Sequence, residues 1–240
     1  MEDKKILIII PAYNEQDNIV DTYQSIVEYN KKNKSNYDVI VINDGSTDDT
    51  QKKCIENNIP TIHLIENLGI GGAVQTGYKY AYDNNYDIAV QFDGDGQHDI
   101  NYVSTIIEPI IKNKAAMVIG SRFIDKNISD FKSTSTRRIG IHLISWLIKL
   151  ITGKKIYDTT SGFRACNRKV IKYFKSNYPT EYPEPITTVE ILKKKLKVVE
   201  LPTKMKERKN GKSSIGSWKN VYYMFNVFIS ILAIGLRGDK

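Results

Sequence analysis

The chain has 240 residues and a formal net charge of +8, with 41% hydrophobic and 26% charged residues. A chain of this length and composition can bury a complete core, and we interpret it as one α/β domain. The positive charge is compatible with nucleic acid, an anionic membrane surface, a phosphorylated substrate or a solvated lysine-rich face. Length and composition therefore indicate a globular α/β domain, and the kind of partner has to be inferred from the motifs.

Cysteine usage and the first residues argue against a secreted protein. Cys54 and Cys166 are far apart in the sequence and have no CxxC spacing. The apolar run at 6–10 is too short for the hydrophobic region of a secretory signal. We therefore expect a buried first strand at this run and a reducing, cytoplasmic setting.

Five apolar, β-branched runs alternate with segments of helix length, at residues 5–10, 39–43, 61–64, 88–92 and 117–120. This alternation predicts a doubly wound, mainly parallel sheet. The runs at 6–10 and 39–42 are apolar at every position, which is typical of central parallel strands buried on both faces. Because ligands bind at the carboxyl ends of the strands in such sheets, the residues that follow each run become the site candidates.

Acidic and turn-forming residues follow the first two runs, at 11–15 and 43–48. A carboxylate at either position can accept hydrogen bonds from a nucleotide base or from ribose hydroxyls. The alternative is structural, with Asn14, Ser46 and Thr47 capping helices and Asp44 making a turn.

The third junction, residues 67–73, is rich in glycine but is not a dinucleotide-binding GxGxxG motif. The third glycine of that motif would fall at Val74, and the segment does not follow the first strand. The sequence also lacks a GxxxxGK[ST] phosphate loop. These glycines are expected to permit a close approach of the helix start to the sheet or to a nucleotide, or to serve the fold alone.

The fourth run leads into Asp93-Gly94-Asp95, the strongest signal in the chain. Two carboxylates separated by one residue at the end of a buried strand can bind one hard divalent cation, which in turn binds phosphate oxygens. A calcium loop of the EF-hand type is excluded, because its twelfth position, counted from Asp93, is Ser104 rather than Glu. A plain Asp-Gly turn remains the alternative, and His98 is either a ligand or a packed residue.

Positive charge gathers in the last third of the chain. A basic stretch at 193–219 leads into an apolar run at 221–236, which is too short to span a bilayer. We expect this run to lie in a membrane interface or to pack on a partner. A second stripe at helical spacing precedes it and fits either core packing or an interfacial helix; it comprises Ile139, Leu143, Trp146, Leu147, Leu150 and Ile151.

Six motifs in order resemble family 2 glycosyltransferases, and most closely the dolichyl- and polyprenyl-phosphate sugar synthases. They are the segments 10–15, 43–48, 67–69, 93–98, 120–123 and 160–164, with the resemblance covering roughly residues 5–215. The resemblance implies a GT-A fold, Mg²⁺ or Mn²⁺ as cofactor, and inversion at the anomeric carbon. By position it implies nucleoside contacts from Pro11, Ala12, Tyr13, Glu15 and Asp44, and metal and diphosphate contacts from Asp93, Asp95 and Gln97.

The segment 158–164 resembles the part of these enzymes that carries an acceptor-side Asp and Arg. We expect Asp158, with Arg122 and Arg164, to act on the acceptor. A sugar hydroxyl would need Asp158 as a base, whereas a lipid phosphate is already largely ionised, and Asp158 would then orient an arginine. The alternatives are a cap or turn for Asp158 and structural ion pairs for the arginines.

Residues 208–214 resemble a mobile loop of the family that closes over the diphosphate, and they supply Arg208 and Lys212 as donor-binding candidates. Ser214 stands where the family pattern has Lys, and Lys212 offers a nearby cation, so the resemblance leaves open which side chain binds the phosphate. A solvated basic linker is the alternative.

The leading hypothesis is therefore an enzyme that moves a sugar from a UDP- or GDP-sugar to a polyprenyl phosphate at the inner face of the cell membrane. Residues 1–216 would form the GT-A domain, and 217–240 a helix that docks on the membrane or on a small membrane subunit. The second hypothesis is a family 2 enzyme with a saccharide, polymer or protein acceptor. A non-catalytic nucleotide or nucleic-acid binder is disfavoured, because the sequence has no nucleic-acid motif and its charge lies near the apolar tail.

Overall fold

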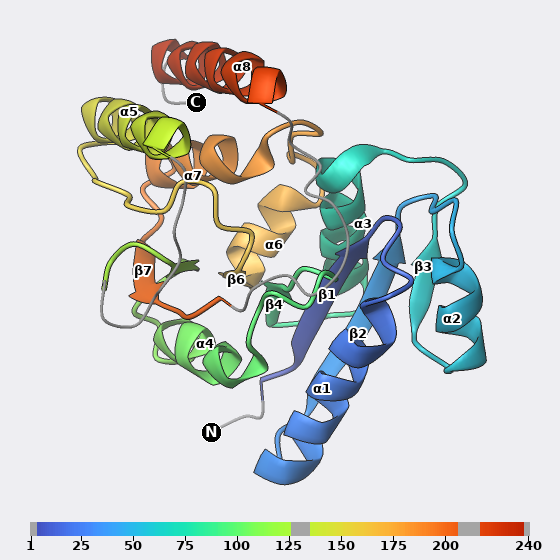
Figure 1. Ribbon diagram of the computed structural model, residues 1–240. Helices are drawn as coiled ribbons and strands as arrows, with labels where there is room; N and C mark the ends of the chain where they lie inside the picture. Colours follow the sequence, from blue (N-terminus) through green and yellow to red (C-terminus); the bar gives the residue numbers. More distant parts are fainter. Residues whose placement is uncertain (1–3, 126–134, 206–216, 238–240) are drawn as a thin grey trace.

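A seven-stranded sheet forms the centre of the molecule in the computed structural model, which describes residues 4–125, 135–205 and 217–237 (Figure 1). The strands are β1 (Ile6–Ala12), β2 (Tyr37–Asn43), β3 (Thr61–His63), β4 (Ile88–Gln91), β5 (Met117–Ser121), β6 (Arg164–Asn167) and β7 (Val198–Pro202). Their order in the sheet is β3-β2-β1-β4-β6-β5-β7. Strand β6 is antiparallel to β4 and β5, and the other paired strands are parallel, which confirms the mainly parallel sheet.

The first strand is longer than the sequence predicts. Its apolar run at 6–10 is buried as expected, but pairing with β2 continues through Pro11 and Ala12, so the expected end at residue 10 is wrong. Proline is tolerated here because β4 pairs with β1 only as far as Ile9. The missing N–H of Pro11 faces that side and leaves no ladder bond unmade.

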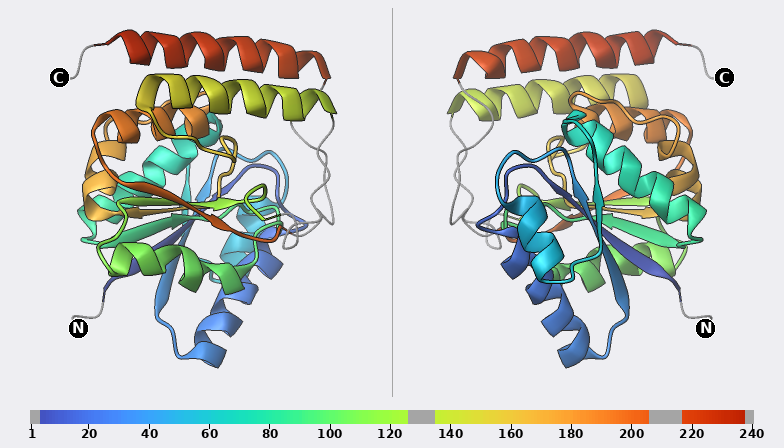
Figure 2. Two further views of the ribbon diagram at one scale, coloured as in Figure 1. Left: turned by 90° about the vertical axis from the view of Figure 1, so that its left-hand side faces the viewer. Right: turned by 90° about the vertical axis from the view of Figure 1, so that its right-hand side faces the viewer.

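Helices cover both faces of the sheet (Figure 2). The helices α1 (Ile19–Asn33) and α4 (Val103–Ile111) lie on one face, with α2 (Thr50–Glu56) packed beside α1. The other face carries α3 (Gly69–Asp83), α6 (Arg168–Phe174) and α7 (Pro183–Lys193). The two cysteines are unpaired and buried in the two opposite core clusters.

An outer layer of two helices lies over α7, formed by α5 (Ser135–Thr152) and α8 (Ser217–Leu236), which run side by side (Figure 2). Helix α5 divides the predicted apolar stripe between two environments. Leu147 is 1% exposed and belongs to the core, whereas Ile139 and Leu150 are 69% and 67% exposed. Core packing is therefore confirmed for one side of the helix, and the other side is exposed. Within the described parts of the chain, no helix is both long and apolar enough to cross a membrane.

Candidate active site

The loops after β1 and β2 are bonded to each other at the carboxyl edge of the sheet. The N–H of Asn14 donates to Ser46 Oγ at 2.9 Å, and the N–H of Thr47 donates back to Asn14 Oδ1 at 2.9 Å. Two further bonds join these loops: the N–H of Asp49 donates to Gln16 Oε1 at 2.9 Å, and the N–H of Gln16 donates to Asp48 Oδ2 at 3.2 Å. These side chains therefore join two loops instead of capping α1 or α2, which favours a preformed surface here.

The predicted nucleoside-contacting residues lie around these loops in different environments. Tyr13 is 46% exposed, and Pro11 and Ala12 are buried in β1. Asp44 is buried, and its Oδ1 accepts the Leu68 N–H at 2.8 Å. Burial raises the pKa of Asp44, and bonds from the backbone at the start of α3 oppose that rise. Asp44 thus ties β2 to α3, while Glu15 Oε2 accepts a bond from Asn18 Nδ2 at 2.8 Å.

The glycines at the start of α3 serve a close approach, as predicted, but the segment that they approach is another loop. A Cβ added at Gly71 would lie 2.0 Å from the carbonyl oxygen of Pro179. The N–H of Gly71 also donates to the carbonyl oxygen of Thr180 at 3.3 Å. The start of α3 is therefore pressed against the loop that leads into α7.

Asp93 and Asp95 follow β4 directly, where the loop lies against the end of β1. The side chain of Asp93 is 32% exposed, and Asp95 Oδ1 accepts the N–H of Gln97 at 3.0 Å. A Cβ added at Gly94 would lie 3.0 Å from the carbonyl oxygen of Pro11, so the loop and β1 are in close contact. Both carboxylates therefore stand at the edge of the sheet where a ligand is expected.

His98 supports this loop from inside. Its Nδ1 accepts the Asp93 N–H at 2.9 Å, and its ring stacks on Phe163 with centroids 4.7 Å apart. Burial lowers the pKa of His98 to about 4, so the imidazole is neutral at pH 7. Of the two alternatives for His98, this geometry favours the packed residue.

The carboxylates of Asp93 and Asp95, which follow β4, suit a hard divalent cation. Carboxylate oxygens are the ligands that Mg²⁺ and Mn²⁺ prefer, and such ions commonly complete their coordination with phosphate oxygens and water. Among the described residues, no three His, Cys, Asp or Glu side chains gather into a cluster. The protein therefore offers a site that suits a cation arriving together with a diphosphate.

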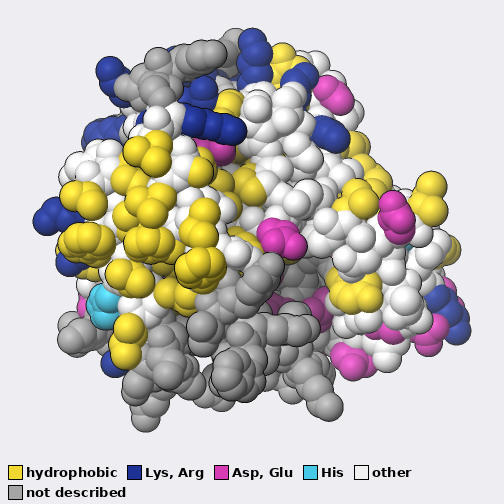
Figure 3. Space-filling model, turned by 90° about the horizontal axis from the view of Figure 1, so that it is seen from above, with side chains coloured by type: hydrophobic (Ala, Val, Ile, Leu, Met, Phe, Trp, Pro, Cys, Tyr) yellow, Lys and Arg dark blue, Asp and Glu magenta, His cyan; other side chains and the backbone are white. Residues whose placement is uncertain are grey.

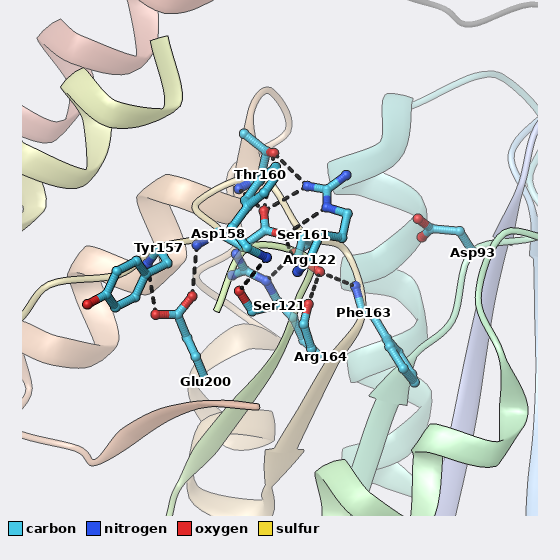
Figure 4. A network of polar contacts seen from close by, with 12 residues as sticks. Asp93, Ser121, Arg122, Tyr157, Asp158, Thr160, Ser161, Phe163, Arg164 and Glu200 are labelled. Atoms are coloured by element: carbon cyan, nitrogen blue, oxygen red, sulfur yellow. Dashed lines mark hydrogen bonds and ion pairs between the residues drawn. The ribbon is translucent and has the colours of Figure 1, made fainter. Parts of the chain in front are cut away.

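A buried ion pair lies across from these carboxylates. Arg122 binds Asp158 through Nε and Nη2, each 2.7 Å from a carboxylate oxygen, and its backbone N–H also donates to Oδ2 at 3.0 Å (Figure 4). Asp158 is 0% exposed and Arg122 is 6% exposed. Burial by itself raises the pKa of Asp158, but the guanidinium and these hydrogen bonds hold that pKa below its ordinary value. Asp158 is therefore ionised, with both oxygens bound.

Sequence reasoning missed residues that hold this pair. The carboxylate of Glu200, on β7, accepts the N–H groups of Tyr157 and Asp158, both at 2.8 Å. Thr160 Oγ1 accepts a bond from Arg122 Nη2 at 2.9 Å. Burial raises the pKa of Glu200, and the two N–H donors oppose that rise. A carboxylate inside an otherwise apolar run at 198–202 was the available signal.

Arg164 does not join the Asp158 pair. It is 1% exposed, its Nε donates to the carbonyl oxygen of Ser161 at 2.7 Å, and its Nη1 donates to Thr187 Oγ1 at 3.1 Å. Arg164 thereby connects the 158–164 loop to α7. Glu184, in the first turn of α7, was also missed; burial raises its pKa, and Arg164 opposes that rise.

The 158–164 loop contacts the carboxylate of Asp93. A Cβ added at Gly162 would lie 3.0 Å from both oxygens of Asp93. In Figure 4 the Asp93 carboxylate points from the end of β4 toward the cluster around Arg122. The structure thus brings the predicted metal-binding residues and the predicted acceptor residues to one place.

Arg208 and Lys212, the two predicted donor-binding cations of the 208–214 segment, lie outside the described residues.

Comparison with known proteins gives consistent matches. A model of the family described as "Glycosyl transferase family 2" matches residues 7–174. A UDP-N-acetylglucosamine–dolichyl-phosphate N-acetylglucosaminyltransferase from Methanococcus voltae is 32% identical, over 98% of this chain and 97% of its own. An undecaprenyl-phosphate mannosyltransferase from Micrococcus luteus is 25% identical, over 88% of this chain and 87% of its own.

Solved structures give a similar result at the level of the fold. The glucosyl-3-phosphoglycerate synthase of Mycobacterium tuberculosis, solved with Mn²⁺ and UDP-glucose, aligns with a TM-score of 0.72. The alignment covers 99% of this chain and 81% of that one, at 18% sequence identity. This likeness shows a shared fold.

Proposed function

We propose that this chain, which belongs to glycosyl transferase family 2, moves a sugar from a nucleotide diphosphate sugar to a polyprenyl phosphate. Its GT-A fold is shared with the mycobacterial synthase. The observation that carries the proposal is the placement of a guanidinium, held by a fully buried carboxylate, across from the Asp93 carboxylate. The relatives named as dolichyl- and undecaprenyl-phosphate transferases support the same acceptor class.

On the donor side, we assign Asp93 and Asp95, with Gln97, to a Mg²⁺ or Mn²⁺ ion and the diphosphate. Such an ion offsets the negative charge that grows on a departing diphosphate. The loops after β1 and β2 would bind the nucleoside through Tyr13, Glu15 and Asp44. UDP is favoured over GDP, because the Methanococcus relative is named for a UDP-sugar and the mycobacterial structure holds one.

On the acceptor side, we assign Arg122 to the lipid phosphate. A guanidinium makes charge-assisted hydrogen bonds to phosphate, and the bonds from Nε and Nη2 to Asp158 and Thr160 hold the guanidinium of Arg122 at a fixed angle. A phosphate monoester has a second pKa near 6, so its oxygen is already a nucleophile at neutral pH and needs no base. In this reaction the phosphate oxygen forms a bond to the anomeric carbon, and the bond from that carbon to the diphosphate breaks with inversion.

A saccharide acceptor is the second candidate function, and it requires a base. Asp158 suits that task poorly, because it is fully buried and both of its oxygens accept hydrogen bonds. Glu184 suits it better, since burial raises the pKa of its carboxyl group and it lies within electrostatic reach of Asp93 and Arg122. A base with such a pKa contributes about 10²- to 10⁴-fold to rate.

We also propose that the enzyme works as a peripheral protein on the inner face of the membrane, through a surface that we call the α5–α8 face. Its large apolar side chains are exposed and gather in one area (Figure 3); they are Ile139, Leu143, Trp146, Leu150, Phe225, Ile229, Leu232 and Leu236. Neither helix contains Asp or Glu, and both contain Lys or Arg, which favours an anionic lipid surface. The segment 217–240, which contains α8, is then a docking segment, and a small membrane subunit is its alternative partner.

The experiment on activity supplies purified protein with a panel of UDP- and GDP-sugars and Mn²⁺, with and without a short polyprenyl phosphate. We expect nucleotide release from one donor, dependent on the metal and on the lipid phosphate. Release that requires a saccharide instead of the lipid phosphate would move the assignment to the second candidate and to Glu184.

The experiment on the α5–α8 face compares two equally exposed substitutions in flotation with phosphatidylglycerol-containing vesicles. Leu150→Glu alters the face, and Ile55→Glu on α2 is the matched control, the two wild-type side chains being 67% and 63% exposed. Burial of one leucine side chain supports a fall in vesicle affinity of about tenfold or more for Leu150→Glu, with little change for the control. Equal behaviour of the two variants would reject this surface.

A further inference from the structure

Gln91 lies directly behind the Asp93 carboxylate. It is the last residue of β4, it is 1% exposed, and its Nε2 donates to Asp93 Oδ1 at 3.4 Å. Its Oε1 accepts a bond from the Tyr178 hydroxyl at 3.4 Å. Both ends of the amide are therefore bonded, which makes a chain of contacts from Tyr178 through Gln91 to Asp93.

Tyr178 sets the direction of this chain. Its ring is packed against Phe174 and Tyr78, with centroid distances of 5.1 and 5.5 Å, and it is 7% exposed. Burial raises the pKa of Tyr178 well above its ordinary value, so the hydroxyl keeps its proton and donates a hydrogen bond to Gln91 Oε1. The amide oxygen can only accept and the NH₂ group can only donate, so the hydrogen bond from Tyr178 goes to Oε1 and leaves Nε2 facing Asp93.

Gly162 covers the junction between the amide and the carboxylate. A Cβ at this position would lie 2.9 Å from Gln91 Nε2 and 3.0 Å from the oxygens of Asp93. The backbone of the 158–164 loop is therefore pressed on both groups at once. This contact limits the positions that the carboxylate can adopt.

We propose that Gln91 is a positioning residue for Asp93 and that Tyr178 fixes the orientation of its amide. The inference rests on the proposed assignment of Asp93 to a divalent cation with a nucleotide diphosphate. Partners that hydrogen-bond to a ligating carboxylate orient it, and their loss typically weakens metal binding or activity 10- to 100-fold. Gln91 itself touches neither sugar nor acceptor in this account.

The test measures Mn²⁺ binding in the presence of UDP by the loss of the free-ion electron paramagnetic resonance signal, without any acceptor. Gln91→Met keeps the length of the side chain and removes the amide, and we expect about tenfold weaker Mn²⁺ binding. Tyr178→Phe removes only a hydroxyl, and a weakening of about two- to threefold is expected from the loss of one hydrogen bond to a neutral partner. The matched control is Tyr78→Phe, whose buried hydroxyl contacts Cys166 Sγ instead.

A double-mutant cycle separates positioning from a general loss of structure. If the amide transmits the effect, Tyr178→Phe has no further effect on Mn²⁺ binding in the Gln91→Met background. The proposal is overturned if Gln91→Met binds Mn²⁺ like the wild type, or if Tyr78→Phe weakens binding as much as Tyr178→Phe does. Should Gln91→Met fail to fold, the comparison of the two tyrosine variants still decides.

The outcome is separate from that of the proposed function. A wild type that binds Mn²⁺ with UDP but transfers no sugar to polyprenyl phosphate would reject the acceptor and leave this inference standing. A wild type that binds no Mn²⁺ would reject the metal assignment and this inference together.

Discussion

The proposed donor half and the proposed acceptor half of the site are built in different ways. The donor residues stand on loops that follow parallel strands, and bonds between neighbouring loops hold them, as between Asn14 and Thr47. The acceptor half depends on a buried ion pair between Arg122 and Asp158, braced by Glu200 from a third segment. Substitutions on the donor side should therefore lower activity without lowering stability, whereas substitutions on the acceptor side should lower both.

The largest expected effect is on the donor side, where Asp95→Asn should abolish turnover without unfolding the protein. The amide keeps the oxygen that accepts the Gln97 N–H but loses the charge that binds a cation. A loss of several kcal/mol of charge stabilisation corresponds to a fall in kcat of about a thousandfold. Asp99→Asn is the control, since Asp99 caps the short helix at Ile100–Tyr102. An Asp95→Asn enzyme with near wild-type kcat would refute the metal assignment.

On the acceptor side, Asp158→Asn should lower both stability and turnover. Removing one partner of a buried ion pair leaves the other uncompensated, at a cost of about 3–5 kcal/mol in the free energy of unfolding. Urea denaturation at pH 7 measures this cost. A variant as stable as the wild type would show that the Arg122–Asp158 pair does not hold the acceptor half together.

The same pair predicts a pH dependence. The folded pKa of Asp158 lies below the unfolded value of about 3.9, so the unfolded state binds the proton more readily. The stabilisation is complete above the unfolded pKa and is lost as pH falls through the folded one. The stability gap between wild type and Asp158→Asn should therefore narrow below about pH 4, which denaturation curves across pH can check. A difference in the free energy of unfolding that grows in acid would contradict a lowered pKa of Asp158 in the folded protein.

A smaller effect is expected where the two halves touch. Gly162→Ala places a Cβ 3.0 Å from the Asp93 oxygens, so the loop or the carboxylate must shift. Overpacking of this kind costs about 1–3 kcal/mol, and misplacing Asp93 should lower kcat by about tenfold. Gly153→Ala is the contrast, because its φ of +74 strains an alanine while nothing lies within 4 Å. Gly153→Ala should lose stability but keep its kcat. If both variants lost kcat to the same extent, the contact between Gly162 and Asp93 would not explain the loss.

The smallest effect is expected for Glu184→Gln, which distinguishes the two candidate functions. With a phosphate acceptor no base is needed, and kcat at neutral pH should change by about threefold or less. Glu181→Gln, at an exposed position just before α7, is the control. A fall of about a hundredfold or more in steady-state kcat would identify a base and favour a saccharide acceptor.

The placement of the proposed donor residues at the ends of β1, β2 and β4 was largely predictable because its signals are local. The runs that end near residues 10, 43 and 92 are mainly apolar, and polar residues follow each of them directly. The end of a strand and the site residues beside it can therefore be predicted from the same short stretch of sequence. What the sequence could not give was the extension of β1 through Pro11. That extension depends on where β4 stops pairing, which is a contact between distant segments.

The acceptor half was predicted less well because its structure depends on distant pairings. Strand β6 begins at Arg164, a charged residue that interrupts any apolar pattern, and it pairs antiparallel with both β4 and β5, which are distant in sequence. Asp158 was expected with Arg122 or Arg164, and only the fold shows that Arg122 is its partner. Gln91 carried no signal, because an amide in an apolar run acquires meaning only beside Asp93 and Tyr178.

The most direct measurement of the central claim is the rate of sugar transfer to a short polyprenyl phosphate beside the rate to the matching polyprenol, with the same donor and Mn²⁺. We expect transfer to the phosphate and none to the alcohol, because Arg122 is assigned to a phosphate and the phosphate oxygen is already ionised, whereas a hydroxyl would have to lose its proton to a base. Transfer to the alcohol at a comparable rate would contradict it.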